Sequence, residues 1–301
     1  MAIKRLDDLF EVLRAKPRKR LVAAYANDAH TIEAVSKAID LGLVEATLVG
    51  DTDTIHKVCQ ELGIDAGRFE IVQESVDTKA VARAVQLINE GRGNLLMKGL
   101  VTTDKYMRGI LNKETGLMPP KAVLSHVTVV QIPTYHKLLT VGDVAIIPAP
   151  DFNQKVAITN YLIRVAKTLG VECPKVAFLA ATEQVSTGMQ ACVDAAVLAK
   201  MGERKQILGA TFDGPLALDV AIDKESASIK KLTSDVAGDA DCLLFPNIES
   251  GNVFFKTCTK FAKAELGAMV MGAKVPCVLT SRGDSVNSKM YSIALAANAA
   301  D

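Results

Sequence analysis

The chain has 301 residues, 49% of them hydrophobic, and its 35 basic and 34 acidic residues give a formal net charge of +1. This length suffices for two domains with substantial cores, and the balanced charge excludes an overall field that would attract nucleic acid or anionic membrane. No run approaches the roughly 20 apolar residues of a membrane span, the amphipathic start is no secretory signal, and the six cysteines form no C-x-x-C pair. We therefore expect a cytoplasmic protein without a disulfide framework or a zinc site.

Apolar strands alternate with amphipathic helices over the first hundred residues. Strands are predicted at 21–26, 44–49, 69–72 and 94–97. The helical segments between them carry apolar residues three and four positions apart and end near Gly42, Gly63 and Gly91. Repeated strand–helix–strand units predict a parallel sheet with helices on both faces.

The pattern changes between about 124 and 148. The stretches VTVVQI, KLLTV and VAII read as three strands, separated only by Pro-Thr-Tyr-His and Gly-Asp. Such short connections cannot make a parallel crossover, so they predict an antiparallel meander. We place a domain boundary there.

The alternation resumes after this meander. Strands are predicted at 175–180, 207–212, 241–245 and 276–280, and helices around 153–169, 189–201, 252–265 and 285–299. The last strand and helix could complete either sheet. Because there is no internal repeat and no long linker, we expect two closely apposed lobes with a cleft between them.

The stretch LTSRGDS, residues 279–285, contains the Arg-Gly-Asp-Ser tetrapeptide of cell-adhesion ligands. A cytoplasmic chain would not meet such a receptor. The stretch instead connects a strand to a helix, where unpaired N–H groups and Arg282 suit an anion such as phosphate. In the alternative interpretation, Ser281 or Ser285 is an ordinary helix cap and Arg282 a surface residue.

Two further strand–turn–helix segments could bind anions. In the first, Lys98 ends a strand, Gly99 permits close backbone approach, and Thr102, Thr103 and Arg108 follow. It has neither P-loop spacing nor a G-x-G-x-x-G fingerprint.

The second of these segments spans residues 245–256, and its helix places Lys256 and Lys260 on one face. Alternatively, Asn252 only caps this helix and the lysines are solvated. Asp235, Asp239 and Asp241 could be metal ligands, but Gly238 favours a turn and we expect no metal. The four histidines form no visible catalytic pairing.

Read together, these segments resemble the phosphate acetyltransferase and phosphate butyryltransferase family. The resemblance covers most of the chain and rests on several blocks in order: LLMKGLVTTDKYMR, SHVTVVQIPTYHKLLTVGDVAIIPAPD, FDGPLALDVAI, VAGDADCLLFPNIESGNVFFK, GAMVMGAKVP and LTSRGDS. The butyryltransferase branch looks nearer, because of IPTYHKLL, DCLLFPNIESGN and Glu183, where acetyltransferases have a Ser/Thr/Gly-rich loop.

The resemblance implies two α/β/α domains with mostly parallel sheets, an architecture similar to isopropylmalate dehydrogenase, with the active-site cleft between them. The implied domains are 1–125 plus 275–301, to which the last strand and helix return, and 126–274. It also implies a homodimer or higher homo-oligomer that uses acyl-CoA and phosphate as substrates and holds no permanently bound cofactor.

The implied site residues are carried over by position. Ser281 and Arg282 match the Ser-Arg pair at the substrate phosphate and thioester, and Arg108 matches the arginine after the paired threonines. Lys260 stands where acetyltransferases usually have arginine. The acetyltransferase aspartate assigned as base for the coenzyme A thiol is replaced by Ser288, so Asp284, the nearest carboxylate in sequence, is our substitute.

The resemblance thus implies catalytic, phosphate-binding and coenzyme A-binding residues. Catalysis is assigned to Ser281, Arg282 and Asp284, phosphate binding to Lys98, Gly99, Thr102, Thr103, Arg108 and Arg282, and coenzyme A binding to Gly251, Asn252, Lys256 and Lys260.

In the implied reaction, phosphate attacks the thioester of a short-chain acyl-CoA in a ternary complex, and two charged segments from opposite lobes converge on that phosphate. The alternatives are a phosphate acetyltransferase, a metal- and NAD-dependent hydroxy-acid dehydrogenase of the same architecture, and a non-enzymatic binding or adhesion module. The sequence leaves the acyl-chain length open.

Overall fold

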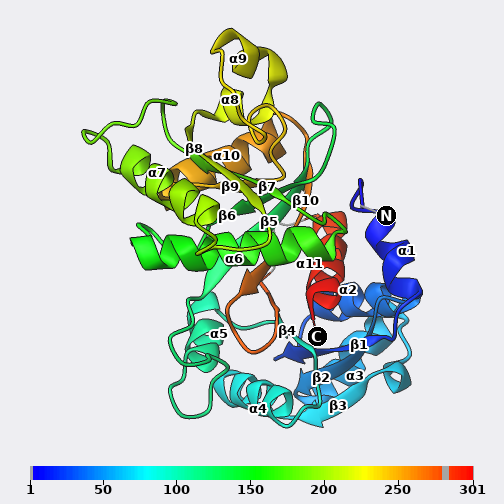
Figure 1. Cartoon of the computed structure of the whole chain (residues 1–301). Coiled ribbons are helices and arrows are strands. Elements are labelled where there is room, and N and C mark those ends of the chain that lie inside the picture. The colour runs from blue at the N-terminus through cyan, green and yellow to red at the C-terminus, as the bar shows by residue number, and fades with distance from the viewer. Residues whose placement is uncertain (1–2, 280–284, 301) are drawn as a thin grey trace. The chain divides into compact units, whose positions relative to one another are not determined.

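The computed structural model describes residues 3–279 and 285–300. The chain divides into two compact units (Figure 1). Unit 1 comprises Met1–Leu6 and Ser125–Leu266, and unit 2 comprises Asp7–Leu124 and Gly267–Asp301. The resemblance implies domains of 1–125 with 275–301 and of 126–274. These limits stay a prediction.

Unit 2 contains a mostly parallel sheet with the strand order β3-β2-β1-β4-β11-β10. Its strands are β1 (Lys19–Ala24), β2 (Val44–Gly50), β3 (Glu70–Gln73), β4 (Leu95–Lys98), β10 (Glu265–Met271) and β11 (Cys277–Val278). Only β10 runs antiparallel to its neighbour β11 among the pairs described in this unit. Because β11 pairs with β4, the last strand completes the amino-terminal sheet, as the resemblance implies.

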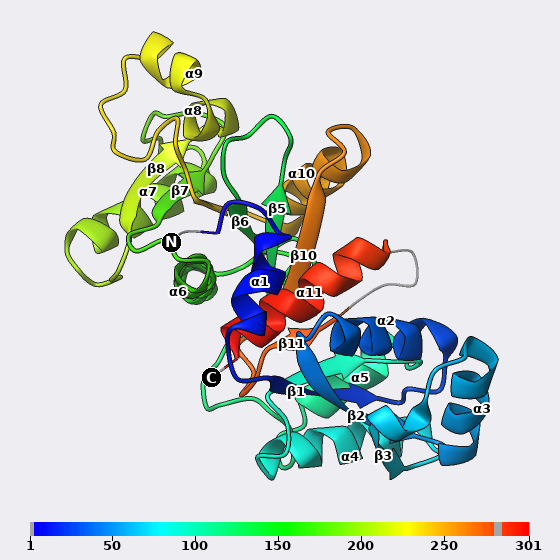
Figure 2. The same ribbon diagram turned by 90° about the vertical axis from the view of Figure 1, so that its right-hand side faces the viewer.

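The helices of unit 2 are α1 (Asp8–Arg14), α2 (Ala29–Asp40), α3 (Thr52–Leu62), α4 (Asp77–Asn89), α5 (Thr103–Ile110) and α11 (Val286–Ala299), with a 3₁₀ turn at Ala66–Arg68. Carboxylate caps begin α2 and α3, and Gly63 ends α3 in the left-handed conformation. Helix α11 is buried along most of its length and packs against α1 and α2 (Figure 2). The rings of Phe10 and Tyr291 stack at 5.5 Å in this contact.

Unit 1 contains the strand order β5-β6-β9-β7-β8. Its strands are β5 (Ser125–Gln131), β6 (Leu139–Gly142), β7 (Lys175–Leu179), β8 (Thr211–Leu216) and β9 (Cys242–Leu244). Strands β5 and β6 pair antiparallel, as predicted, while β6, β9, β7 and β8 run parallel.

The third predicted meander strand, VAII, does not form. The carboxylate of Asp143, 2% exposed, accepts hydrogen bonds from the N–H groups of Ala145 (2.7 Å), Ile146 (2.9 Å) and Ile147 (3.4 Å). These donors are therefore satisfied by a side chain rather than by a neighbouring strand.

The helices of unit 1 are α6 (Phe152–Thr168), α7 (Gln190–Glu203), α8 (Leu218–Ile222), α9 (Lys224–Ile229) and α10 (Ile248–Lys260). The prediction of a helix at 252–265 is shifted, because Asn247 caps α10 and accepts from Ser250 N (3.0 Å). The stretch that follows α10 is strand β10, which was not predicted. No helix in the described ranges is long and apolar enough to span a membrane.

Candidate functional site

Two of the predicted turns begin at one edge of the unit 2 sheet. Strands β4 and β11 are parallel neighbours, with Leu96 opposite Cys277 and Met97 opposite Val278. The hydroxyl of Tyr106 donates to the carbonyls of Leu96 (3.0 Å) and Val278 (3.4 Å) and so ties α5 to both strands. The segments that leave β4 and β11 thus start side by side, at the carboxyl ends where α/β sheets bind ligands.

This arrangement corrects one expectation. Two charged segments were expected to converge from opposite lobes, although the implied domain 1–125 plus 275–301 already contained both; unit 2 likewise contains both stretches of sequence, Asp7–Leu124 and Gly267–Asp301. Thr280–Asp284, including the predicted catalytic residues Ser281, Arg282 and Asp284, lie outside the described residues.

The turn after β4 is held by its own polar groups. Lys98 Nζ donates to the carbonyls of Gly99 (3.2 Å) and Val101 (2.9 Å). Gly99 N–H donates to Ala24 O (3.0 Å), and a Cβ at Gly99 would lie 2.3 Å from Tyr25 O. The glycine is therefore explained by the close approach of β1, and its N–H is already engaged within the sheet.

Helix α5 presents the predicted hydroxyls at its first turn. Thr102 is the N-cap and its hydroxyl accepts from Lys105 N (3.4 Å), and Thr103 is the first helical residue; both are exposed. Arg108 lies in the last turn, with its side chain 79% exposed and its Nε 3.0 Å from a carboxylate oxygen of Asp104. A phosphate at the start of α5 would have to draw this guanidinium away from Asp104.

Helix α11 begins at the other turn. Ser285 is its N-cap, as the alternative interpretation of this stretch held: its Oγ accepts from Ser288 N (3.1 Å) and lies 3.0 Å from Ser288 Oγ. Ser288 thus takes part in the helix cap.

The third turn, in unit 1, is packed against the Asp143 loop. A Cβ at Gly251 would lie 2.4 Å from Asp143 O, and Asn252 Nδ2 donates to Val144 O (3.1 Å). Asn252 therefore does not cap α10, contrary to the alternative interpretation, but fastens it to this loop. Lys256 and Lys260 are both exposed on the same helix.

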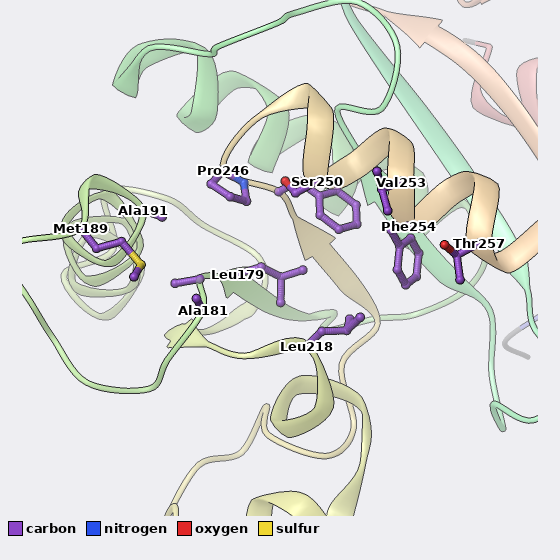
Figure 3. Close-up of a pocket in the computed structure, with 12 residues that line it drawn as sticks. Leu179, Ala181, Met189, Ala191, Leu218, Pro246, Ser250, Val253, Phe254 and Thr257 are labelled. Atoms are coloured by element: carbon purple, nitrogen blue, oxygen red, sulfur yellow. The ribbon is translucent and has the colours of Figure 1, made fainter.

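An apolar pocket of about 530 Å³, which the sequence did not reveal, opens in unit 1 at the carboxyl ends of β7, β8 and β9 (Figure 3). Leu179, the last residue of β7, and Phe245, which follows β9, are among the residues that line it. Val253 and Phe254 line it from α10, and Met189 from the start of α7. Of the four α10 residues that line it, only Val253 and Phe254 are apolar, and such a pair ordinarily packs into a core, so the sequence carried no specific signal for the pocket.

Glu183, the residue that pointed to the butyryltransferase branch, lies in the loop between β7 and α7. Its Oε2 accepts from Lys230 Nζ (2.9 Å), and this hydrogen bond lowers the pKa of the carboxyl from its ordinary value of 4.5. The ion pair ties the β7–α7 loop to the segment just after α9.

Two of the aspartates of 235–241, Asp239 and Asp241, make ion pairs. Asp239 lies 2.7 Å from Lys175 Nζ, 3.0 Å from Lys137 Nζ and 2.8 Å from His136 Nε2. Across the described ranges, no group of three or more His, Cys, Asp or Glu side chains is placed to hold a metal ion.

These ion pairs predict a pH dependence of stability. Burial alone would raise the pKa of Asp239, but hydrogen bonds from Lys175, Lys137 and His136 outweigh it and hold that pKa well below the ordinary 3.8. Its stabilising contribution is therefore present above about pH 4 and is lost as the pH falls toward the folded pKa. Asp239→Asn should lower the free energy of unfolding at pH 7, and the gap to the parent should shrink toward pH 3.

Urea denaturation at both pH values measures this gap. Asp235→Asn, an exposed aspartate in the same turn, serves as the matched control. A gap for Asp239→Asn that stays constant with pH would contradict the assignment.

The chain is similar to known transferases over most of its length. The family model described as "Phosphate acetyl/butaryl transferase" matches residues 68–297. A phosphate butyryltransferase of Clostridium beijerinckii is 42% identical over 98% of this chain and 97% of its own length. The crystal structure of a branched-chain phosphotransacylase from Enterococcus faecalis V583 is similar with a TM-score of 0.82 and 30% identity, covering 93% of this chain and 98% of that one.

A 4-hydroxythreonine-4-phosphate dehydrogenase from Klebsiella pneumoniae shares the fold alone, with a TM-score of 0.57 and 10% identity, covering 95% of this chain and 100% of that one. It fits the dehydrogenase-like architecture that was expected, but the dehydrogenase alternative for the activity is not supported, because the family match and the full-length relative are transferases. The chain belongs to the phosphate acetyl/butaryl transferase family.

Proposed function

We propose that this chain is a phosphate acyltransferase of the butyryltransferase type, which converts a short-chain acyl-CoA and inorganic phosphate to acyl phosphate and coenzyme A. The observation that carries the proposal is the parallel pairing of β4 with β11. Because of this pairing, the Lys98–Thr103 turn and the stretch that contains Ser281 and Arg282 both follow the carboxyl ends of neighbouring parallel strands. Both predicted anion-binding segments can then serve one ligand.

The phosphate would be bound by the amino-terminal end of α5 and by cations. Thr102 and Thr103 offer hydroxyls there, Gly99 shapes the turn, and Lys98, Arg108 and Arg282 supply positive charge. Each charged hydrogen bond contributes about 1.5–3 kcal/mol. Such contacts are needed because phosphate and acyl-CoA are both anions, and their repulsion must be overcome before they can react.

The chemistry then needs one bond formed and one broken. A phosphate oxygen attacks the thioester carbonyl, the tetrahedral oxyanion accepts a hydrogen bond from Ser281, and the C–S bond breaks as the thiolate leaves. Phosphate dianion needs no base in this direction. In reverse, the coenzyme A thiol must lose its proton, and we assign this step to Asp284, because a serine at 288 is not a base.

Coenzyme A would be bound along α10. The exposed Lys256 and Lys260 lie one turn apart and would meet its phosphate groups. Gly251 and Asn252 hold the start of this helix against the Asp143 loop. We further propose a cytoplasmic homodimer or higher homo-oligomer that holds no permanently bound cofactor.

The test is coenzyme A release from butyryl-CoA with phosphate present and absent, followed with a thiol reagent. We expect release only with phosphate, and butyryl phosphate that hydroxylamine traps as the hydroxamate. Release without phosphate, or none at all, would overturn the proposal. A parallel assay with acetyl-CoA decides between the butyryl type and its phosphate acetyltransferase alternative, which a higher kcat/KM for acetyl-CoA would support.

A further inference from the structure

We propose that Glu183 is a further substrate-binding residue, whose carboxylate oxygen Oε1 accepts a hydrogen bond from an amide N–H of acyl-CoA. The amide concerned is that of the cysteamine unit, which lies nearest the thioester. This inference rests on the proposed function and adds a contact to the uncharged arm of the same substrate, which none of the residues assigned so far recognises.

The two carboxylate oxygens of Glu183 differ in their surroundings. Oε2 accepts a hydrogen bond from Lys230 Nζ at 2.9 Å. Oε1 is buried and has no hydrogen-bond partner among the residues that the structure describes, and the side chain as a whole is only 12% exposed. Buried acceptors are almost always paired, because an open one is costly. A donor that arrives with a ligand would satisfy this oxygen.

The carboxylate lies beside the pocket of unit 1. Glu183 follows closely after Ala181, which lines the pocket, as does Leu218 (Figure 3). The hydrogen bond from Lys230 has the largest effect in lowering the pKa of Glu183, and the nearby N–H of Ala217, the residue before Leu218, lowers it further. The carboxylate is therefore close to two segments of the pocket wall, which follow the carboxyl ends of β7 and β8, where ligands of α/β sheets bind.

Charge decides which part of the substrate can meet this oxygen. Because its pKa is lowered, Glu183 is ionised at neutral pH and can only accept hydrogen bonds. It would repel inorganic phosphate and the phosphate groups of coenzyme A. The thioester and the acyl chain carry no N–H or O–H group.

The arm between the phosphates and the sulfur is uncharged and does carry donors. Its cysteamine N–H is separated from the sulfur by only two carbons, so a group beside the reaction site can reach it. Lys230 offsets the charge of Glu183, and a hydrogen bond from an amide to a carboxylate is stronger than one between neutral groups. The cysteamine N–H is therefore the donor that fits Oε1 best.

The experiment measures kcat/KM in the phosphate-dependent assay for butyryl-CoA and for an analogue in which a methylene group replaces the cysteamine N–H. In the parent enzyme the analogue should lose at least about tenfold, because the carboxylate is left without its donor. In Glu183→Ala the two substrates should differ by less than about threefold, because the acceptor is already gone. The melting temperature of each variant is recorded in parallel.

Three controls separate binding from a structural role. Glu203→Ala removes a carboxylate that pairs with Lys200 at 2.5 Å on α7, at an exposed position outside the pocket, and should keep the parental preference. Lys230→Met leaves the carboxylate of Glu183 in place and should keep most of that preference. A second analogue, with a methylene group in place of the other amide N–H, should lose equally in the parent and in Glu183→Ala.

The outcomes are distinct. A loss below twofold for the first analogue in the parent would overturn the inference without recourse to any variant. An undiminished preference in Glu183→Ala would also overturn it, because Oε1 would then not be the acceptor of the cysteamine N–H. Equal losses for both substrates in Glu183→Ala and in Lys230→Met would reduce the pair to an anchor of the β7–α7 loop. If the parent released no coenzyme A from butyryl-CoA, the proposed function would fail instead.

Discussion

Replacing Arg282 by alanine should lower kcat by more than about 100-fold while the fold stays intact, because this guanidinium is assigned to the phosphate throughout the reaction. A charged bidentate contact that strengthens as the tetrahedral intermediate forms contributes several kcal/mol, and each 1.4 kcal/mol corresponds to a factor of ten. The measurement is steady-state coenzyme A release as a function of phosphate concentration, with the circular dichroism spectrum and melting temperature recorded for the same preparation.

Arg83→Ala is the matched control for this variant. Arg83 lies on α4, and its guanidinium pairs with Glu90 at 3.3 Å, so its loss should leave kcat and the KM for phosphate within about twofold of the parent. Arg108→Ala should mainly raise the KM for phosphate. Phosphate must draw this guanidinium away from Asp104, so we assign Arg108 to the binding of phosphate rather than to the chemical step. An Arg282→Ala enzyme with the parental kcat and phosphate dependence would remove Arg282 from the site.

Asp143→Ala should lower the free energy of unfolding by about 3–5 kcal/mol, the largest stability effect that we expect. Besides the N–H groups of residues 145–147, this buried carboxylate accepts from Ser125 Oγ (2.8 Å) and His126 N (3.1 Å). Its removal leaves two buried donors, Ser125 Oγ and His126 N, and three partly buried N–H groups without an acceptor, and each buried donor costs about 1–3 kcal/mol unless water reaches it. Urea denaturation with fluorescence or circular dichroism detection measures the loss.

Asp151→Ala provides the comparison, since it also removes one carboxylate from unit 1. Asp151 caps α6 and accepts from Gln154 N (2.8 Å) at an exposed position. Losing such a cap typically costs about 1 kcal/mol. If Asp143→Ala were no more destabilising than Asp151→Ala, the role of Asp143 as the acceptor that organises residues 143–147 would be wrong.

Much of the fold could be predicted from local pattern. The spacing of apolar residues and the terminating glycines located α2, α3 and α4, because each of these helices has one buried face. Failures occurred where a side chain replaced a strand partner, as Asp143 does for 144–147, or where a cap lay outside the apolar run, as Asn247 does for α10. Strand β10 was missed because an alternating pattern was not sought so soon after a helix.

The roles of the candidate site residues stay predictions, and the structure supplies part of their geometry. Sequence spacing brought Lys98, Thr102 and Thr103 to a strand end, and the pairing of β4 with β11 shows that the chain leaves the neighbouring strand at the same end after Val278. The sequence could not show that Arg108, in the last turn of α5, pairs with Asp104 in the first turn, since this contact depends on side-chain rotamers. The pocket depends on side chains from the end of β7, from helices α7, α8 and α10 and from the loops between them, which meet only after folding, and no local pattern marks it.

The interleaving of β11 between β4 and β10 has a consequence for biosynthesis. On the growing chain, β4 presents an unpaired edge until β11 has been made, because β11 begins at Cys277, long after β4 ends at Lys98. Residues 125–266 of unit 1 can form their hydrophobic core during synthesis. Residues 7–124 of unit 2 meanwhile expose the unpaired edge of β4. Nascent chains stalled or truncated before Cys277 should therefore depend on chaperones and aggregate when these are depleted.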